Sequence, residues 1–420
     1  MARLEQVTIQ PNGSLYDVVG DFSLDGLTED AVVNVLRPRH SIRTSIDLAL
    51  AAFKVSWKNP PMPEPGAVDE DALRSSCTRF LSWHGMRRPA DLLAELPDDI
   101  APDRYGDGGA VTELEAEVSS LLAKPAAAFL PSGTMAQQVT LRVHADARGR
   151  RVVLFHPACH IDRHEGGGYQ RLHHLVGRRV GDELRLVTLE DLRAVAEPPA
   201  ALLLELPQRD LGGQLPAWEE LVEQVEWAHE GGAAAHMDGA RLWGCGPFYG
   251  RTLAQIAGLF DTVYVSLYKQ LGGITGCCLA GPEDVVAEVS EWRKRHGGTL
   301  YALWPYAASG LAGLRRRLRR MPAYQEHALA IASAVKELPG VEVVPDPPHT
   351  PMMHLLLPTG ANELRAAALR MAEHERIWTW PHSVPTGSSH VQRVELEVGD
   401  ATLEFTPEEF RDVLQRLLPD

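Results

Sequence analysis

Two segments of the chain combine residue types that could hold an anion and a protonated nitrogen. Ser132-Gly133-Thr134 follows an apolar run that ends at Leu130 and precedes a stretch of helical periodicity. Glycine lets the backbone approach closely, while hydroxyls and the free N–H groups at a helix start attract an anion such as phosphate. Asp238, with Arg241 three residues later, could hold a protonated ring nitrogen. Taken alone, the first segment would also suit an ordinary helix N-cap, and the second a turn carboxylate paired with an arginine.

Two further segments offer a nucleophile and an imidazole. Lys269 lies between the apolar run 262–265 and a Gly-Gly pair. A lysine this close to a buried strand is desolvated, which lowers its pKa and makes the neutral amine a nucleophile for carbonyl carbons. His156 and His160 follow the apolar run 152–155, where a histidine could act as a base, stack on a flat ring or be structural.

The apolar runs predict buried strands of a parallel sheet, because each is short and continuously apolar. They span residues 126–130, 152–155, 201–204 and 262–265. Amphipathic stretches lie between them, at residues 112–122, 134–145 and 216–230. Strand, helix and strand in repetition predict an α/β fold. Ligands of such a sheet bind beyond the carboxyl ends of its strands, so the four segments should meet at one edge.

Pyridoxal phosphate requires the parts that these four segments supply. Its phosphate binds at a helix N-terminus, its pyridine nitrogen needs an acidic partner, and its aldehyde needs a lysine. A flat histidine can stack on its ring. Together the segments therefore predict pyridoxal phosphate as the cofactor.

The composition is that of an ordinary globular protein with an acidic surface. The 420 residues are 45% hydrophobic and carry a net charge of -15, which disfavours binding to nucleic acid or to an anionic membrane surface. No apolar run approaches the roughly 20 residues that span a bilayer, and the N-terminus lacks the apolar core of a secretion signal. The five cysteines lack zinc-ligand spacing, so no metal site is expected, and they suggest reduced core residues of a cytoplasmic protein. They are Cys77, Cys159, Cys245, Cys277 and Cys278.

Three regions are predicted along the chain. Residues 1–75 form an N-terminal extension of unknown role, with an amphipathic helix at 41–53 and a proline-rich linker at 59–66. Residues 76–310 form the large domain and residues 311–420 a smaller α+β domain. The arginine cluster at 315–320 is expected on a solvated or subunit-facing helix rather than at a nucleic-acid site.

Residues 100–300 resemble the threonine aldolase and β-eliminating lyase family of fold-type I pyridoxal-phosphate enzymes. The segments that carry the likeness are Tyr105-Gly106-Asp107, 129–135, Cys159-His160-Ile161, Glu165-Gly166-Gly167, 236–243, 266–269 and Trp292-Arg293-Lys294. The resemblance implies the fold-type I fold, with a mainly parallel seven-stranded sheet in the large domain and a smaller α+β C-terminal domain. It also implies a homodimer or homotetramer with active sites at subunit boundaries.

The resemblance implies a role for each residue of the cofactor site. Lys269 would form the Schiff base, Asp238 would bind the ring nitrogen, and His160 would stack on the ring and could act as a base. These three would be the catalytic residues. The complete predicted cofactor set is Ser132, Gly133, Thr134, His160, Asp238, Arg241 and Lys269.

On the substrate side, the chain departs from the family pattern. Arg241 and Arg393 are candidates to bind the substrate carboxylate, although Arg393 would equally suit a surface position on an edge strand. Gln208 stands where the family has a histidine that faces the β-hydroxyl, and glutamine takes no proton near neutral pH. Trp83-His84-Gly85 replaces a Ser-Asp-Thr segment, and an arginine expected near Tyr301 is missing.

These observations predict a pyridoxal-phosphate-dependent lyase that acts on an L-amino acid. The favoured reaction is retro-aldol cleavage of a β-hydroxy-amino acid to glycine and an aldehyde, with β-elimination to a 2-oxo acid and ammonia as the alternative. A non-catalytic regulatory or binding member of the fold is the alternative from another class. Threonine is expected to be a poor substrate, and a bulky or polar side chain beyond Cβ is favoured. The predicted pocket holds Trp83, Gln208, Arg209, Tyr301 and His84, the last as a replacement base.

Overall fold

The computed structural model describes residues 7–8, 33–34 and 68–419. The chain divides into two compact units, Met1–Asp69 and Glu70–Asp420. In the first unit, β1 (Val7–Thr8) pairs in parallel with β2 (Val33–Asn34). The predicted helix at 41–53 and linker at 59–66 lie outside the described residues. The domain boundaries at 75 and 310 stay predictions.

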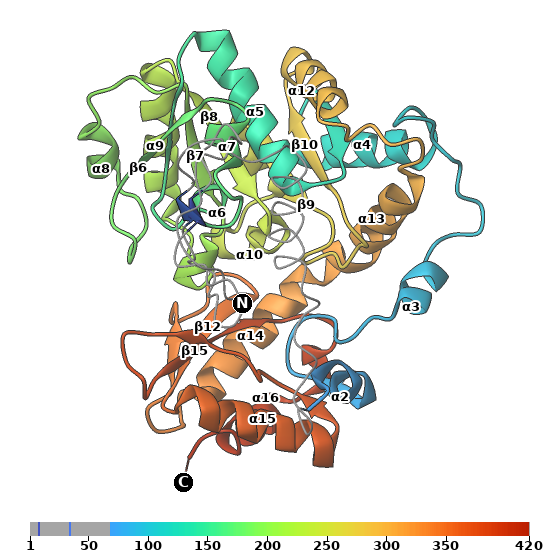
Figure 1. The fold of residues 1–420 in the computed structure, drawn as a ribbon, viewed down its shortest axis with the longest axis vertical. Coiled ribbons are helices and arrows are strands. Elements are labelled where there is room, and N and C mark those ends of the chain that lie inside the picture. Colours follow the sequence, from blue (N-terminus) through green and yellow to red (C-terminus); the bar gives the residue numbers. More distant parts are fainter. Residues whose placement is uncertain (1–6, 9–32, 35–67, 420) are drawn as a thin grey trace. The chain divides into compact units, whose positions relative to one another are not determined.

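The second unit is built on a seven-stranded sheet in the order β4-β10-β9-β8-β7-β5-β6 (Figure 1). Only β10 runs antiparallel to its neighbours, so the sheet is mainly parallel, as predicted. The strands are β4 (Ala126–Leu130), β5 (Val152–Phe155), β6 (Val176–Arg179), β7 (Ala201–Glu205), β8 (Ala234–Gly239), β9 (Thr262–Ser266) and β10 (Cys277–Gly281). All four predicted apolar runs form strands of this sheet, because each was long enough and apolar enough to be buried on both faces.

Helices cover both faces of the sheet, and the alternation of side chains along β10 shows how. Cys277 and Leu279 pack into a cluster with residues of α5 (Gly133–Arg148) and α12 (Glu283–Arg295). Cys278 and Ala280 point to the opposite face and join the main core with α4 (Gly109–Leu122), α9 (Trp218–Glu230) and α13 (Trp304–Arg317). The shorter helices are α6 (His160–Arg163), α7 (Gly168–Arg171), α8 (Leu189–Arg193), α10 (Gly246–Tyr249) and α11 (Leu253–Gly258).

A smaller antiparallel sheet follows in the C-terminal part, in the order β11-β12-β15-β14. Its strands are β11 (Glu342–Val344), β12 (Met352–Leu357), β14 (Val384–Pro385) and β15 (Gln392–Glu397). The helices of this part are α14 (Met321–Val335), α15 (Ala361–Glu375) and α16 (Pro407–Gln415). Residues that precede the large sheet also belong here, since β3 (Arg79–Phe80) pairs in parallel with β13 (Ile377–Trp378). Helices α2 (Glu70–Ser76) and α3 (Pro89–Ala94) flank β3 in the chain.

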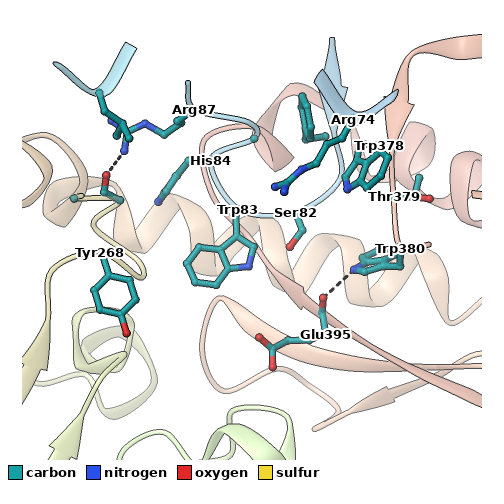
Figure 2. Close-up of a pocket in the computed structure, with 15 residues that line it drawn as sticks. Arg74, Ser82, Trp83, His84, Arg87, Tyr268, Trp378, Thr379, Trp380 and Glu395 are labelled. Atoms are coloured by element: carbon teal, nitrogen blue, oxygen red, sulfur yellow. Dashed lines mark hydrogen bonds between the residues drawn. The ribbon is translucent and has the colours of Figure 1, made fainter. Parts of the chain in front are cut away.

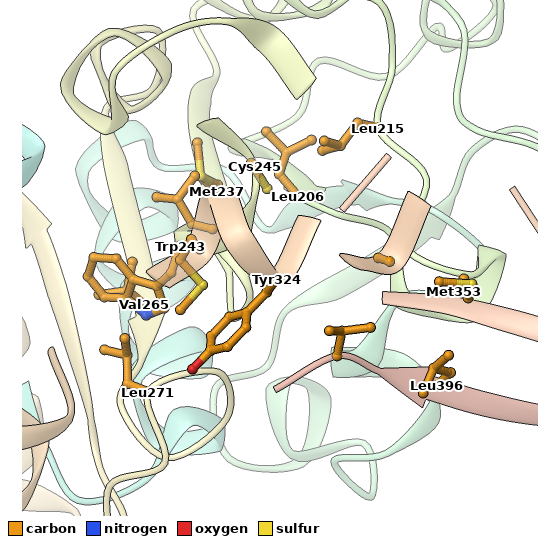
Figure 3. Packing of buried hydrophobic residues seen from close by; sticks show 14 of the residues in the cluster. Leu206, Leu215, Met237, Trp243, Cys245, Val265, Leu271, Tyr324, Met353 and Leu396 are labelled. Carbon is orange, nitrogen blue, oxygen red and sulfur yellow. The ribbon is translucent and has the colours of Figure 1, made fainter. Parts of the chain in front are cut away.

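One hydrophobic core joins the two sheets. Met237 and Val265 of the large sheet belong to the same buried cluster as Tyr324 of α14 and Met353 and Leu396 of the smaller sheet (Figure 3). The C-terminal strands are therefore held rigidly against the large sheet rather than tethered by a linker. Among the described residues, no helix has the length and apolar character that a membrane crossing requires.

All five cysteines are free and buried, in agreement with the prediction of reduced core residues.

The arginine cluster at 315–320 differs in part from the expectation of a solvated helix. That expectation is wrong for Arg317, which is 2% exposed and donates from Nε to Asp400 at 2.8 Å. The flanking Arg315 and Arg316 are exposed and pair with acidic residues of neighbouring segments.

Candidate active site

A cavity of about 190 Å³ brings together most of the residues that were predicted to bind the cofactor. The catalytic candidates Lys269, His160 and Asp238 all line it, together with the segment Ser132–Thr134. The remaining lining residues are Pro131, Gln137, Glu165, Tyr264, Tyr268 and Thr275. Arg241 is the one member of the predicted cofactor set that does not line this cavity.

The segment Ser132–Thr134 presents the N-terminus of a long helix to the cavity. Ser132 is extended, with φ -140° and ψ 133°, and Gly133 begins the 16-residue helix α5. No side chain in the described part of the chain caps this end, so its first N–H groups can bind an anion. A Cβ at Gly133 would lie 2.2 Å from the hydroxyl oxygen of Tyr264, so only glycine fits here.

Lys269 and Asp238 lie at the ends of adjacent strands. Lys269 is on the loop between β9 and β10, where burial lowers its pKa and the nearby Arg241 charge adds to the effect. Asp238, at the end of β8, is 4% exposed, and its Oδ1 accepts the amide of Ala240 at 3.0 Å. The amine and the carboxyl group needed for a pyridoxal cofactor therefore line one cavity.

His160 is held by a carboxylate that sequence reasoning left without a role. Its Nδ1 lies 3.2 Å from Oε1 of Glu165, whose side chain is 1% exposed and also accepts from Gln138. The hydrogen bond with Glu165 raises the pKa of His160 despite its partial burial. The Glu-Gly-Gly motif at 165–167 is the sequence feature from which a role for Glu165 could have been predicted. His156, by contrast, is structural, because its Nε2 contacts the carbonyl oxygens of Asp182 and Arg185.

Gln208 does not line the cavity, contrary to the expectation that it faces the substrate. It is 3% exposed, and its amide nitrogen donates to the carbonyl of Ala158 and to Glu205. Glu205 also accepts the backbone amides of His160 and Arg209. Burial, with the nearby Asp238 charge, raises the pKa of Glu205 to about 7. Gln208 is therefore structural: it binds Glu205, the same carboxylate that accepts the backbone amide of His160.

Arg241 is engaged by carboxylates of the C-terminal sheet. Its Nε donates to Glu397 at 2.9 Å and its terminal nitrogen to Glu395 at 3.4 Å. Although burial opposes it, His354 and Arg241 hold the pKa of Glu395 at about 2. Arg393 does not line the cavity of Lys269, and it lies on β15, an inner strand of its sheet, so the edge-strand interpretation is wrong.

A second cavity, of about 460 Å³, adjoins the first, and Tyr268 lines both. Figure 2 shows the Trp83 indole inside it, with Tyr268 on one side and Trp378 and Trp380 on the other. Its other lining residues are Arg74, Phe80, Ser82, His84, Gly85, Arg87, Leu92, Gly272, Gly273, Thr379 and Glu395. Segments from both ends of the second unit therefore build an aromatic chamber next to Lys269.

His84 lines this chamber but is not available as a base. Its Nδ1 accepts the amide of Asp400 at 3.1 Å, and its Nε2 lies 2.9 Å from the carbonyl of Gln270. Both ring nitrogens are thus engaged in a neutral ring, and burial and the Arg317 charge lower its pKa to about 4. Tyr301 does not line either cavity; it is 63% exposed and packs edge-on against Tyr105, with ring centroids 5.4 Å apart.

The residues present fit pyridoxal phosphate. The glycine turn that a Cβ would fill and the uncapped helix N-terminus suit a phosphate. Lys269 suits the aldehyde, Asp238 the pyridine nitrogen and His160 the face of the ring.

Comparisons with known proteins agree with this geometry. The family model of the beta-eliminating lyases matches residues 86–357. Low-specificity L-threonine aldolase 1 of Arabidopsis thaliana is 28% identical over 272 residues, which are 61% of this chain and 75% of the relative. The low-specificity L-threonine aldolase of Escherichia coli K12 is 30% identical over 254 residues, 59% of this chain and 75% of the relative.

Solved structures extend the likeness to most of the chain. A protein of Listeria monocytogenes EGD-E, provisionally named an L-allo-threonine aldolase, has a TM-score of 0.78 and 36% identity, covering 83% of this chain and 98% of its own. A protein of Exiguobacterium sp. 255-15, provisionally named an aromatic amino acid beta-eliminating lyase/threonine aldolase, has a TM-score of 0.77 and 37% identity, covering 82% and 98%. The predicted resemblance and fold are confirmed. The chain belongs to the beta-eliminating lyase family and is a threonine aldolase-like enzyme of the pyridoxal-phosphate-dependent class.

Proposed function

We propose that this enzyme cleaves a β-hydroxy-α-amino acid by a retro-aldol reaction, releasing glycine and an aldehyde. The observation that carries the proposal is the single cavity that Lys269, Asp238, His160 and the segment Ser132–Thr134 share. The relatives named as threonine aldolases support this reaction over β-elimination.

The roles of the chain's own residues follow from their surroundings. The chemistry that bound pyridoxal phosphate supplies is an electron sink for the pair released at the substrate Cα. Lys269, whose pKa is lowered by burial, would attach to the cofactor aldehyde, and Asp238 would hold the ring nitrogen. Ser132, Gly133 and Thr134 would hold the phosphate.

His160 is the proposed base that removes the β-hydroxyl proton as the Cα–Cβ bond breaks. Gln208 and His84 have all their nitrogens engaged elsewhere. Among the described residues, the His160 ring hydrogen-bonds through Nδ1 alone, which leaves Nε2 to receive a proton over the cavity. Glu165 fixes this tautomer by accepting from Nδ1.

The aromatic chamber supports a substrate with a bulky group on Cβ. Trp83, Trp378 and Trp380 give it apolar walls next to the residue that lines both cavities, Tyr268. Such walls favour a large or aromatic substituent over a methyl group. The exclusion of threonine is not supported by the comparisons, since the relatives are named for that substrate. We therefore propose that the enzyme prefers a β-hydroxy-amino acid with a large Cβ substituent to threonine. Threonine itself is included among the substrates to be assayed.

The test is a product assay with threonine, allo-threonine, β-phenylserine and serine. Glycine and aldehyde in equal amounts are expected, with activity lost in Lys269→Ala. A 2-oxo acid and ammonia would refute the retro-aldol reaction in favour of β-elimination. A protein that binds pyridoxal phosphate but converts none of these amino acids would favour a regulatory or binding role.

We also propose a homodimer or homotetramer located in the cytoplasm. The exposed pair Tyr105 and Tyr301 and the segment Trp304-Pro305-Tyr306 offer apolar surface suited to an interface. Analytical ultracentrifugation of the active enzyme tests the assembly, and a fully active monomer would contradict it.

A further inference from the structure

One buried side chain of the cofactor cavity has an amide nitrogen that no described residue satisfies. Gln137 is 2% exposed and lines the cavity, and its Oε1 lies 2.6 Å from Nε2 of His236. Its Nε2 is buried and has no hydrogen-bond partner among the described residues. A buried donor left unpaired destabilises the protein, so such groups usually serve a partner.

A chain of hydrogen bonds determines which end of this amide is the donor. It runs through Arg148, His144, Thr262 and His236 to Gln137, with distances of 3.5, 2.8, 2.8 and 2.6 Å. A guanidinium can only donate, so Nδ1 of His144 accepts and its Nε2 carries the hydrogen. The single hydroxyl hydrogen of Thr262 is then left for Nδ1 of His236, whose Nε2–H donates to Gln137 Oε1.

Both histidines are neutral, as this order of donors and acceptors requires. Burial and the Arg148 charge lower the pKa of His144 to about 4, and burial lowers that of His236 to about 3. His236 and Thr262 are 0% exposed, so water does not compete for these bonds. In every bond of this chain the donor lies on the Arg148 side and the acceptor on the Gln137 side. Gln137 therefore accepts through Oε1, and its NH₂ group remains available to donate.

The position of Gln137 directs that free end to the cofactor. It follows Gly133 by four residues on α5, so the two share one face of the helix. Side chains on a helix lean towards its N-terminus, which here is the anion-binding turn. Resting on the proposed function, we propose that Gln137 Nε2 donates a hydrogen bond to an anionic oxygen of bound pyridoxal phosphate. His236, Thr262 and His144 are then positioning residues that fix the donating orientation.

The first experiment measures the Kd of pyridoxal phosphate for the full-length apoprotein by absorbance titration. Gln137→Met keeps the size of the side chain but removes the donor, and a tenfold to hundredfold weaker Kd is expected, as for one hydrogen bond to a charged group. The matched control is Gln224→Met, since Gln224 is 1% exposed and its amide donates to Val187 instead. Its Kd should equal that of the wild type. A Kd for Gln137→Met within twofold of the wild type overturns the inference.

Pyridoxal, which lacks the phosphate, identifies the acceptor. A loss confined to pyridoxal phosphate supports a phosphate oxygen, and an equal loss with pyridoxal supports the ring hydroxyl oxygen. Should Gln137→Met not fold, Gln137→Glu keeps the shape and replaces the donor by an acceptor. It should bind the cofactor more weakly still, and tighter or equal binding overturns the inference. A wild-type protein that binds neither compound would overturn the proposed function as well.

A double-mutant cycle tests the positioning chain. Thr262→Val removes the hydroxyl that joins the two histidines and should weaken the Kd several-fold. Combined with Gln137→Met it should add nothing, because the valine acts only through the amide. If the double variant instead loses affinity by the product of the two single-variant factors, the positioning role of Thr262 and the histidines is overturned.

Discussion

Removing one partner of the buried pair between Arg241 and Glu397 should lower the free energy of unfolding, and the loss can be measured. The side chains are 6% and 2% exposed, and Nε lies 2.9 Å from Oε2. Unit charges about 4 Å apart interact by about 4 kcal/mol at an effective dielectric constant near 20. Removing one partner of a buried pair costs about 3–5 kcal/mol, because the remaining charge is left uncompensated. Glu395 keeps its contact with Arg241, so we expect the lower end, about 3 kcal/mol, for Glu397→Leu.

Urea unfolding of the apoenzyme checks this value. Glu397→Gln should lose only about 1–2 kcal/mol, since its amide oxygen still accepts from Arg241. Glu288→Gln is the control, because that residue pairs with Arg295 at 2.8 Å while 48% exposed and should change stability by less than about 1 kcal/mol. If Glu397→Leu unfolds at the same urea concentration as the control, the buried charges do not hold the two sheets together and the reasoning is refuted.

Three further predictions follow from the described contacts. The free energy of unfolding should fall as pH drops from 6.5 towards 4, because a buried histidine such as His84, with its pKa at about 4, binds more protons when unfolded. The full loss is about 3 kcal/mol for this group, and a flat profile from urea unfolding at several pH values would contradict it. Glu165→Gln should move the acidic limb of kcat/KM to lower pH, since the carboxylate raises the pKa of His160, and an unchanged limb would exclude His160 as the base. Gly133→Ala should abolish cofactor binding in a titration, as the added Cβ would lie 2.2 Å from a tyrosine hydroxyl, whereas Gly258→Ala meets open space and should bind normally.

The sequence predicted those parts of the site that follow directly from a strand. Asp238 and Lys269 could be found because short apolar runs mark buried strands and ligands bind beyond their ends. The partners that modify these groups come from far away in the chain and leave no local pattern. Glu397 contacts Arg241 across 156 residues, and the amide of Asp400 reaches His84 across 316. His84 therefore resembled a base in sequence, although the fold has engaged both of its nitrogens.

The reversed direction of β10 has a consequence for how much freedom Lys269 retains. The loop at 267–276 leaves β9 and returns into the adjacent strand, where Cys277 is the register partner of Ser266. The amide of Leu267 also donates to the carbonyl of Gly276, which closes the loop at its base. This loop joins neighbouring strand ends directly, whereas a connection to a parallel strand would have to cross back over the sheet. Strand pairing therefore fixes both ends of the loop that carries Lys269, which limits how far the lysine can move while β9 and β10 stay paired.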